Sequence, residues 1–417
     1  MQIRSLLFAA VALLWLAAGL AASPAGAIDS APDPSTLGPF DVGHTQMDVV
    51  DPEREDRTLP TEIWYPADPG SAVGDPTLYP LLGPIGITSA VAVDDIPPTE
   101  EMFRPLILFS HGSGGFAIQS IVLVETLASH GFFVAAPNHV GNTQSDEMNG
   151  TSDPFDVIAR NRPQDASAVI DTMLERGFTP GDPFFLKIRP FMIGAAGHSF
   201  GGFTVLALSG GYEDIPADPR VTAILPISGA AGILSDEELE AVDVPTLLLG
   251  GTADEVVPID PVTVRAFDLI STPGGQKYRV DIEGATHFHF ANICDIASVL
   301  IGIGLTPEMW PLIGAGALVE PYEKTCIPPA YPIDEAVRIQ NLYNVSFFNR
   351  YLLLDWRYQY FLTRFYAAHY EPDVTMIRAD GPWCGLGFEL VLILPPLLWL
   401  RNRRRRAGAL SAGAQLR

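Results

Sequence analysis

The chain has 417 residues, of which 47% are hydrophobic, and a formal net charge of −24 at pH 7. A balance this acidic disfavours nucleic acid as a partner, because phosphate backbones attract basic surfaces, and it favours solubility. The length between the two atypical ends suits one elaborated α/β enzyme domain rather than several small domains.

The N-terminus has the pattern of an export signal. One early basic residue, Arg4, precedes a long apolar run, and Ala25-Gly26-Ala27 fits the small-residue cleavage pattern A-x-A. A transmembrane start is the alternative, but the cleavage pattern and the polar segment behind it favour removal. We therefore expect a signal peptide at residues 1–27 and an exported protein in the periplasm or at the cell surface.

The C-terminal segment, residues 376–417, carries a second targeting pattern. Cys384-Gly385 precedes an apolar run at 386–400 and five arginines at 401–406. Fifteen helical residues span only about 22 Å, less than the roughly 30 Å hydrocarbon core. The order resembles bacterial C-terminal sorting signals of the PEP-CTERM type, although it lacks Pro-Glu-Pro. This resemblance implies association with the membrane or cell envelope and a sorting protease as a partner; a plain tail anchor is the alternative.

Between these ends, residues 28–375 alternate short apolar runs with segments of helical period. This alternation predicts an α/β fold in which helices cover both faces of a mostly parallel central sheet. The expected strands, in chain order, are TEIWYP, PLILFS, FFVAAP, FMIGAA, VTAILPIS, PTLLLGG and YRVDIE. A helix is expected over 162–177, where apolar residues recur at helical spacing and Gly177 ends the pattern.

Two stretches break the alternation. Residues 295–375 are aromatic-rich and include a helical pattern in NLYNVSFFNRYLLLDW, so we expect a helical C-terminal part or a lid. The stretch LYPLLGPIGITSAVAVDDIPP, between the first two predicted strands, is longer than a normal connection. We expect it to overhang a site.

The stretch Gly197-His198-Ser199-Phe200-Gly201 fits the G-x-S-x-G pattern, in which glycines allow a sharp turn from strand to helix and expose a serine. The pattern alone is weak, and a structural glycine turn is the alternative. An apolar strand ends just before it, and FTVLALSGG continues with the apolar character of a buried helix. This context predicts that Ser199 is a nucleophile.

A serine nucleophile needs an imidazole to accept its proton and a carboxylate to orient that imidazole. Asp254 follows the predicted strand PTLLLGG, in a loop where such a sheet displays functional groups. Glu255 and Asp260 are competitors in the same loop. We favour Asp254 as the carboxylate.

The candidate base, His287, follows the predicted strand YRVDIE, and the order Ser199, Asp254, His287 is that of α/β-hydrolases. His289 is a rival base two residues later. In an extended stretch the two histidines would share a face and could form a metal pair. No further His or Cys stands at ligand spacing, so the sequence predicts no metal and no other cofactor.

A developing oxyanion needs a pair of backbone N–H groups. The glycine-rich loop His111–Gly115 after the predicted strand PLILFS supplies one side, and the N–H of Phe200, directly after the nucleophile, supplies the other. A phosphate-binding loop is the competing interpretation, but no lysine follows the glycines.

Three cysteines occur in the chain. Export permits disulfides, and Cys294 and Cys326 are the expected pair because Cys384 belongs to the C-terminal motif. Two free thiols are the alternative.

Together these motifs resemble one family, the serine α/β-hydrolases grouped as predicted dienelactone hydrolases and platelet-activating-factor acetylhydrolase-like esterases. The similar residues cover most of the chain from Arg57 to Cys294. In order, they are EIWYP, FSHGSGG, ASHGFFVAAPNHVGNT, RPQDASAVID, GAAGHSFGG, VPTLLLGGTADEVVP and EGATHFHF. A true dienelactone hydrolase carries cysteine at the nucleophile position, so that part of the family name does not imply the substrate.

The resemblance implies a catalytic triad of Ser199, Asp254 and His287 and an oxyanion hole formed by the amides of Ser113 and Phe200. The expected function is hydrolysis of small or medium acyl esters through an acyl-enzyme. The alternatives are hydrolysis of lipids, such as phospholipids like platelet-activating factor, or of polyesters, and a non-catalytic surface binding module on the same fold.

Overall fold

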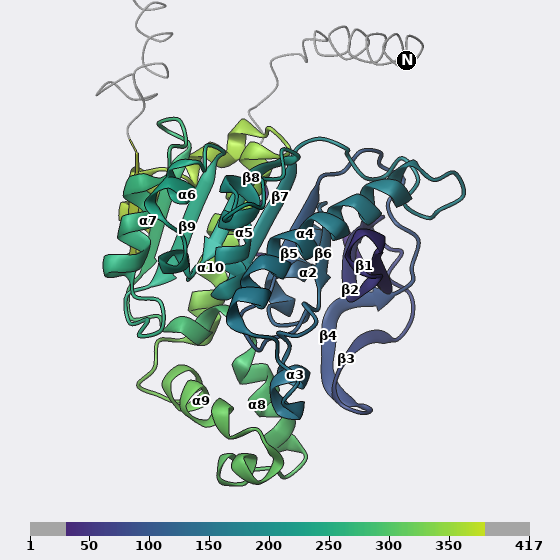
Figure 1. Ribbon diagram of the computed structural model, residues 1–417, viewed down its shortest axis with the longest axis vertical. Coiled ribbons are helices and arrows are strands. Elements are labelled where there is room, and N and C mark those ends of the chain that lie inside the picture. Colours follow the sequence, from purple (N-terminus) through teal and green to yellow (C-terminus); the bar gives the residue numbers. More distant parts are fainter. Residues whose placement is uncertain (1–30, 380–417) are drawn as a thin grey trace, which may run out of the picture. The chain divides into compact units, whose positions relative to one another are not determined.

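A single mixed sheet organises residues 31–379, the part of the chain that the computed structural model describes (Figure 1). Its strands lie in the order β11-β10-β9-β8-β7-β5-β6-β2-β1-β4-β3. The strands are β1 (Asp41–Asp51), β2 (Arg57–Ala67), β3 (Pro76–Leu82), β4 (Ile85–Asp94), β5 (Leu106–Ser110), β6 (Phe133–Pro137), β7 (Ile193–His198), β8 (Val221–Ile227), β9 (Thr246–Gly251), β10 (Lys277–Ile282) and β11 (Val374–Arg378). The predicted signal peptide and the predicted motif Cys384-Gly385 lie outside the described residues.

The centre of the sheet, from β6 to β10, is parallel throughout. Its strands are buried on both faces, which explains why they read as continuous apolar runs such as LILF in β5. All seven predicted strands are present, as β2 and β5 to β10. The structure therefore has the α/β-hydrolase architecture that the sequence predicts.

Helices cover both faces of this sheet. They are α2 (Ile121–Ser129), α3 (Gln144–Asn149), α4 (Phe155–Phe178), α5 (Phe200–Gly210), α6 (Asp236–Glu240), α7 (Val264–Leu269), α8 (Ile293–Gly302), α9 (Val319–Cys326), α10 (Ile333–Tyr351) and α11 (Arg364–Tyr370). In Figure 1, α4 and α5 lie in front of the sheet. The predicted helix at 162–177 is part of α4, which begins earlier than expected, at Phe155, and continues through Pro163.

Alternate residues of β7 show how the two layers are built. Ile193 and Ala195 pack into the core that includes residues of α4 and α5. Gly194 points to the other face, where a Cβ atom would lie only 2.8 Å from Phe348 and Leu352, at the end of α10. The missing side chain lets α10 pack directly against the strand.

The stretch expected to overhang a site is instead part of the sheet. Its residues form most of β3 and β4, a hairpin that turns at Gly83 and extends one edge. Tyr79 of β3 and Ser89 of β4 donate hydrogen bonds to the carboxylate of Glu125 on α2, at 2.7 and 2.6 Å. In addition, β4 pairs with β1 and contacts α8, so the stretch builds the sheet edge beside that helix.

Residues 295–375 divide into three parts with different surroundings. The helix α10 is buried against the sheet, whereas β11 pairs with β10 at the sheet edge. The predicted end of the domain at residue 375 falls inside β11. Residues 293–326, called the cap below, form a separate group of helices; Figure 1 shows α8 and α9 at the lower end, close to α3, and α8 contacts β4.

The cap has a small core of its own around Ala297, Leu300 and Trp310. Among the described residues no single helix is long and apolar enough to cross a bilayer. Within the same residues, only α8 and Pro307–Ile313 taken together are long and apolar enough, and this pair is bent by 91°.

A disulfide joins Cys294 to Cys326 and so closes the cap at its two ends. Reduction is expected to lower the free energy of unfolding by about 3–4 kcal/mol, because the bond restricts a loop with a sequence separation of 32 in the unfolded chain. Urea unfolding with and without reductant measures this difference. A variant with both cysteines replaced by serine should unfold at the same urea concentration with and without reductant. Equal midpoints of urea unfolding for the reduced and the oxidised unmodified protein would contradict the expectation.

Candidate active site

Ser199 occupies the turn between β7 and α5 in a strained conformation, with φ 57° and ψ −117°. A non-glycine residue adopts a positive φ only where its surroundings impose it. Here the turn is tight, since a Cβ on Gly197 would collide with Gly201, and one on Gly201 with the carbonyl of Ser110. The elements on either side are buried, whereas Ser199 is half-buried and reachable.

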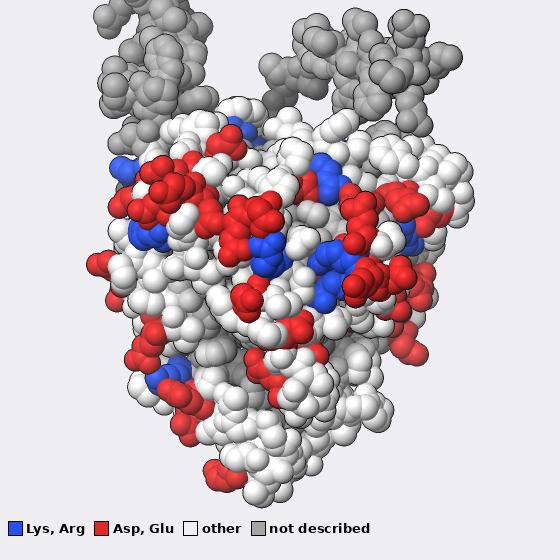
Figure 2. All heavy atoms as spheres, viewed as in Figure 1, with Lys and Arg blue, Asp and Glu red and all other residues white. Residues whose placement is uncertain are grey.

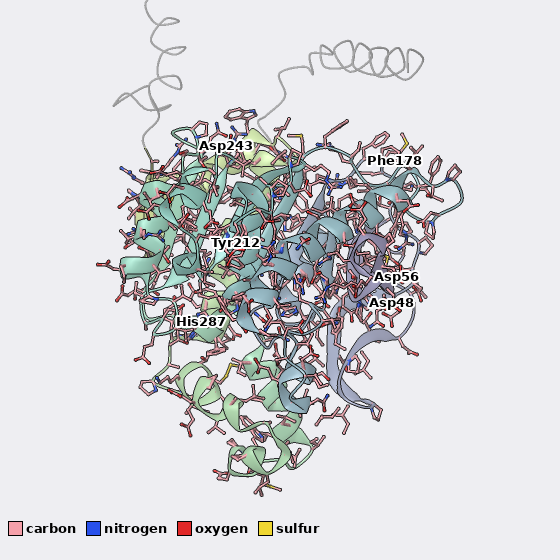
Figure 3. All side chains as sticks on the ribbon, in the orientation of Figure 1. Asp48, Asp56, Phe178, Tyr212, Asp243 and His287 are labelled. Atoms are coloured by element: carbon pink, nitrogen blue, oxygen red, sulfur yellow. A yellow bond between two sulfur atoms is a disulfide. The ribbon has the colours of Figure 1, made fainter. Side chains whose placement is uncertain are left out.

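The loops after β9 and β10 bring Asp254 and His287 together. Oδ2 of Asp254 accepts a hydrogen bond from Nδ1 of His287 at 2.8 Å, and both side chains are buried. Since β7, β9 and β10 are parallel, their carboxyl ends meet at one edge of the sheet, and Figure 3 shows His287 where this edge faces the cap. The rings of His287 and His198 are 4.6 Å apart, which puts the base next to the nucleophile turn.

The carboxylate of Asp254 is held in its charged form. Its Oδ1 accepts the backbone N–H groups of Val256 and Val257, at 2.9 and 2.7 Å. Burial alone would raise the pKa of Asp254, but the hydrogen bond and charge of His287 and the Val257 N–H lower it below its ordinary value. An ionised Asp254 fixes the proton of His287 on Nδ1 and leaves Nε2 free to accept one.

The competing residues are engaged elsewhere. Glu255 is exposed and forms an ion pair with Lys324 at 2.5 Å, and Asp260 is exposed. His289 accepts the Thr286 N–H at Nδ1 and donates from Nε2 to the carbonyl of Tyr331, both at 2.9 Å. With both nitrogens used, His289 has no lone pair left for a metal or for a serine proton.

The glycine-rich segment His111–Gly115 after β5, called the oxyanion loop below, lies against the nucleophile. A Cβ on Gly112 would be 3.3 Å from the Cβ of Ser199. Within the described residues the N–H of Ser113 donates to no acceptor, and the N–H of Phe200 begins α5, before the hydrogen-bond ladder of the helix. Both predicted oxyanion donors are thus unused by the protein.

Beneath this loop lies a buried arginine that the sequence reasoning did not single out. Arg162 on α4 is fully buried and donates from Nη2 to the carbonyl of His111. Its guanidinium carbon is 5.1 Å from the centre of the Phe200 ring, within the range of a cation–π contact. Burial lowers the pKa of Arg162 to about 9. Arg162 therefore touches both sides of the predicted oxyanion hole.

A second Ser-His-Asp arrangement lies behind the first. Ser110 Oγ is 3.0 Å from Nε2 of His139, and Nδ1 of His139 is 3.0 Å from Oδ2 of Asp165. All three side chains are buried, and Arg57 also binds the Asp165 carboxylate. Burial prevents substrate from reaching Ser110, so this arrangement supports the loop rather than the chemistry. The motif RPQDASAVID, which contains both Arg162 and Asp165, was the sequence signal that could have pointed to these two residues.

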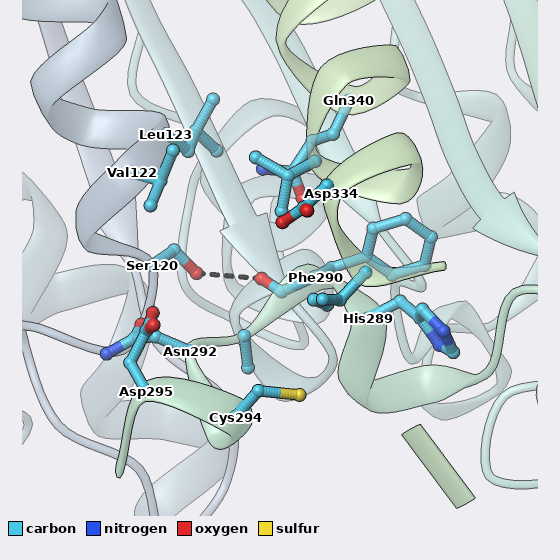
Figure 4. Close-up of a pocket in the computed structure, with 13 residues that line it drawn as sticks. Ser120, Val122, Leu123, His289, Phe290, Asn292, Cys294, Asp295, Asp334 and Gln340 are labelled. Atoms are coloured by element: carbon cyan, nitrogen blue, oxygen red, sulfur yellow. Dashed lines mark hydrogen bonds between the residues drawn. The ribbon is translucent and has the colours of Figure 1, made fainter. Parts of the chain in front are cut away.

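A cavity of about 270 Å³ lies next to His289 and Phe290, and its lining includes neither Ser199 nor His287 (Figure 4). It lies between α2, α10 and the short helix His287–Phe290, called the histidine turn below, and its lining includes Leu123, Asn292 and Gln340. The cavity therefore adjoins the back of the histidine turn and is not a pocket for the reacting acyl group.

The chain is similar to a known family over part of its length. The family model described as platelet-activating factor acetylhydrolase, isoform II, matches residues 87–149. This segment runs from β4 through the oxyanion loop to α3, so it includes Ser113 but none of Ser199, Asp254 and His287. The chain is similar to this family over that segment, and together with the fold the likeness supports a hydrolase of the esterase or lipase type.

Proposed function

We propose that this chain is an exported serine hydrolase that cleaves carboxylic esters through Ser199, His287 and Asp254. The observation that carries the proposal is the hydrogen-bonded pair Asp254–His287 beside a strained, reachable serine. The unused N–H groups of Ser113 and Phe200 add a site for an oxyanion. The disulfide between Cys294 and Cys326 supports an oxidising compartment outside the cytoplasm.

In the proposed mechanism Ser199 Oγ attacks the ester carbonyl while Nε2 of His287 takes the hydroxyl proton. The negative oxygen of the tetrahedral intermediate is bound by the amides of Ser113 and Phe200. His287 then gives its proton to the departing alcohol oxygen, and an acyl-Ser199 ester remains. Water, deprotonated by His287, attacks this ester, and the acid leaves as Ser199 regains its proton.

The exposed surface of the cap favours a lipid ester as a second candidate substrate. Several apolar side chains of the cap are exposed to solvent: Leu312 is 83% exposed, and Ile303 and Met309 are also exposed. Figure 2 shows acidic side chains over much of the viewed face but few charges at the lower end. Exposed apolar side chains on the cap would suit a substrate with a long acyl chain.

A fluorophosphonate probe tests the proposal directly. We expect it to form a covalent bond with Ser199, located by mass mapping of the labelled peptide, and to abolish hydrolysis of p-nitrophenyl acetate or butyrate. Rates along a series from acetate to palmitate distinguish the substrates, because a maximum at long chains favours the lipid ester. A folded protein that neither reacts with the probe nor hydrolyses any ester would instead support the binding module.

A further inference from the structure

The start of α2 touches both loops from which the proposed mechanism draws its groups. Gln119 Oε1 accepts the N–H of Gly112 in the oxyanion loop at 2.8 Å. Its Nε2 donates to Nδ1 of His198 at 2.7 Å, and Nε2 of His198 donates to the carbonyl of His287 at 2.9 Å. An unbroken chain of hydrogen bonds thus runs from the oxyanion loop to the histidine turn.

We propose that Gln119 and His198 are positioning residues that set the distance between the oxyanion loop and the catalytic base. The inference rests on the proposed ester hydrolysis. Neither residue touches the reacting atoms: Gln119 acts through Gly112, and His198 acts through the backbone of His287. Both side chains are buried, so the chain is shielded from competing water.

The chemistry of the two side chains fits this role. A carboxamide offers one acceptor and one donor group in a fixed fork, so Gln119 can bind an N–H on one side and a lone pair on the other. His198 must then be neutral, with its proton on Nε2. Burial, followed by the nearby charge of His287, lowers the pKa of His198 to about 3 and keeps it neutral at ordinary pH.

The other end of the histidine turn is tied to the same helix start. Asn292 N donates to the carbonyl of Gln119 at 2.8 Å, and its side-chain amide donates to the carbonyl of Ile118 at 3.0 Å. Ser120 Oγ donates to the carbonyl of Phe290 at 2.9 Å, as Figure 4 shows. The residues around Gln119 therefore hold the histidine turn at its beginning and at its end.

This arrangement matters because the groups that act together come from different loops. The amide of Ser113 follows β5, whereas His287 follows β10, four strands along the sheet order. No single element sets the distance between them. An error in that distance weakens the bonds made in the transition state more than those made to the bound ester, so it should lower kcat more than it changes KM.

The first test replaces Gln119 by methionine, which keeps the length of the side chain but removes both hydrogen bonds. We expect kcat for p-nitrophenyl butyrate to fall by about 10- to 100-fold with KM within about threefold. Thr126→Val is the matched control, because Thr126 lies buried on α2, the helix that follows Gln119, but outside the hydrogen-bonded chain. Circular dichroism and thermal unfolding establish that both variants fold.

The second test, Gln119→Glu, distinguishes a positioning role of Gln119 from a role in packing alone. A glutamate keeps the acceptor for Gly112 but sets a second acceptor against Nδ1 of His198. The bond at Nδ1 and the bond from Nε2 to the carbonyl of His287 can then form together only when the glutamate–His198 pair carries an added proton. The activity of this variant relative to the unmodified protein should therefore rise as the pH falls. A merely structural role predicts a ratio that does not change with pH.

The proposal is overturned if Gln119→Met keeps kcat within about threefold, or if the activity ratio of Gln119→Glu is the same at every pH. Ser199→Ala is assayed in parallel. Its inactivity alongside a fully active Gln119→Met would leave the proposed function standing and remove only the positioning role. Full activity of Ser199→Ala would overturn both.

Discussion

Ester hydrolysis is expected to fall by at least about 10⁴-fold when Ser199 is replaced by alanine. The hydroxyl oxygen forms the bond to the acyl group, so without it the covalent route is closed. The remaining rate would come from water attack assisted by the oxyanion donors. The backbone of the turn is held by several bonds, including Ser199 N to the carbonyl of Ile227 at 2.9 Å, so the variant should fold.

The chain supplies its own matched control for this substitution. Ser110 makes the same kind of contact to a histidine and a buried aspartate as a catalytic serine would, but it is fully buried in β5. Ser110→Ala should keep kcat/KM within about tenfold while losing some stability, because the variant leaves Nε2 of His139 without its partner.

Initial rates with p-nitrophenyl butyrate and labelling by the fluorophosphonate probe measure both variants. If Ser110→Ala lost activity and Ser199→Ala kept it, Ser110 would be the nucleophile and Ser199 the structural residue. If both variants kept full activity, neither serine would be the nucleophile, provided that thermal unfolding shows each variant to be folded.

The candidate site could be read from the sequence because its parts follow strands. In a parallel sheet every carboxyl end reaches the same edge, so Asp254 after β9 and His287 after β10 had to arrive near the turn after β7. The same reasoning could not choose between His287 and His289, which differ by two residues. The contacts in the structure separate them: His287 bonds to Asp254, whereas His289 bonds to Thr286 and Tyr331.

What the sequence did not reveal depends on contacts between distant segments. Gln119 bonds to His198, 79 residues later, and Arg57 to Asp165, 108 residues later. Such pairs leave no periodic pattern, because the two partners lie far apart in the chain and neither marks the position of the other. The edge strands β3 and β4 were missed for another reason: they lie in a stretch rich in Gly and Pro, which local rules assign to loops.

Replacement of Asp254 by asparagine is expected to lower kcat by about 10⁴-fold with little change in fold. Oδ1 accepts two backbone N–H groups and Oδ2 accepts the His287 proton, so the residue needs acceptors on both sides. An asparagine side chain has only one acceptor atom, its amide oxygen. The amide oxygen will face the two N–H groups, where two bonds are gained, and the NH₂ group will face Nδ1 of His287.

That orientation puts the His287 proton on Nε2, where it can no longer accept the proton of Ser199. Raising the pH should restore part of the activity, because hydroxide removes the hydroxyl proton without the base. Glu255→Gln is the matched control: it makes the same chemical change one residue away, on an exposed side chain that pairs with Lys324, and should keep kcat within about twofold. Equal activities of the two variants across the pH range would show that Asp254 does not orient the base.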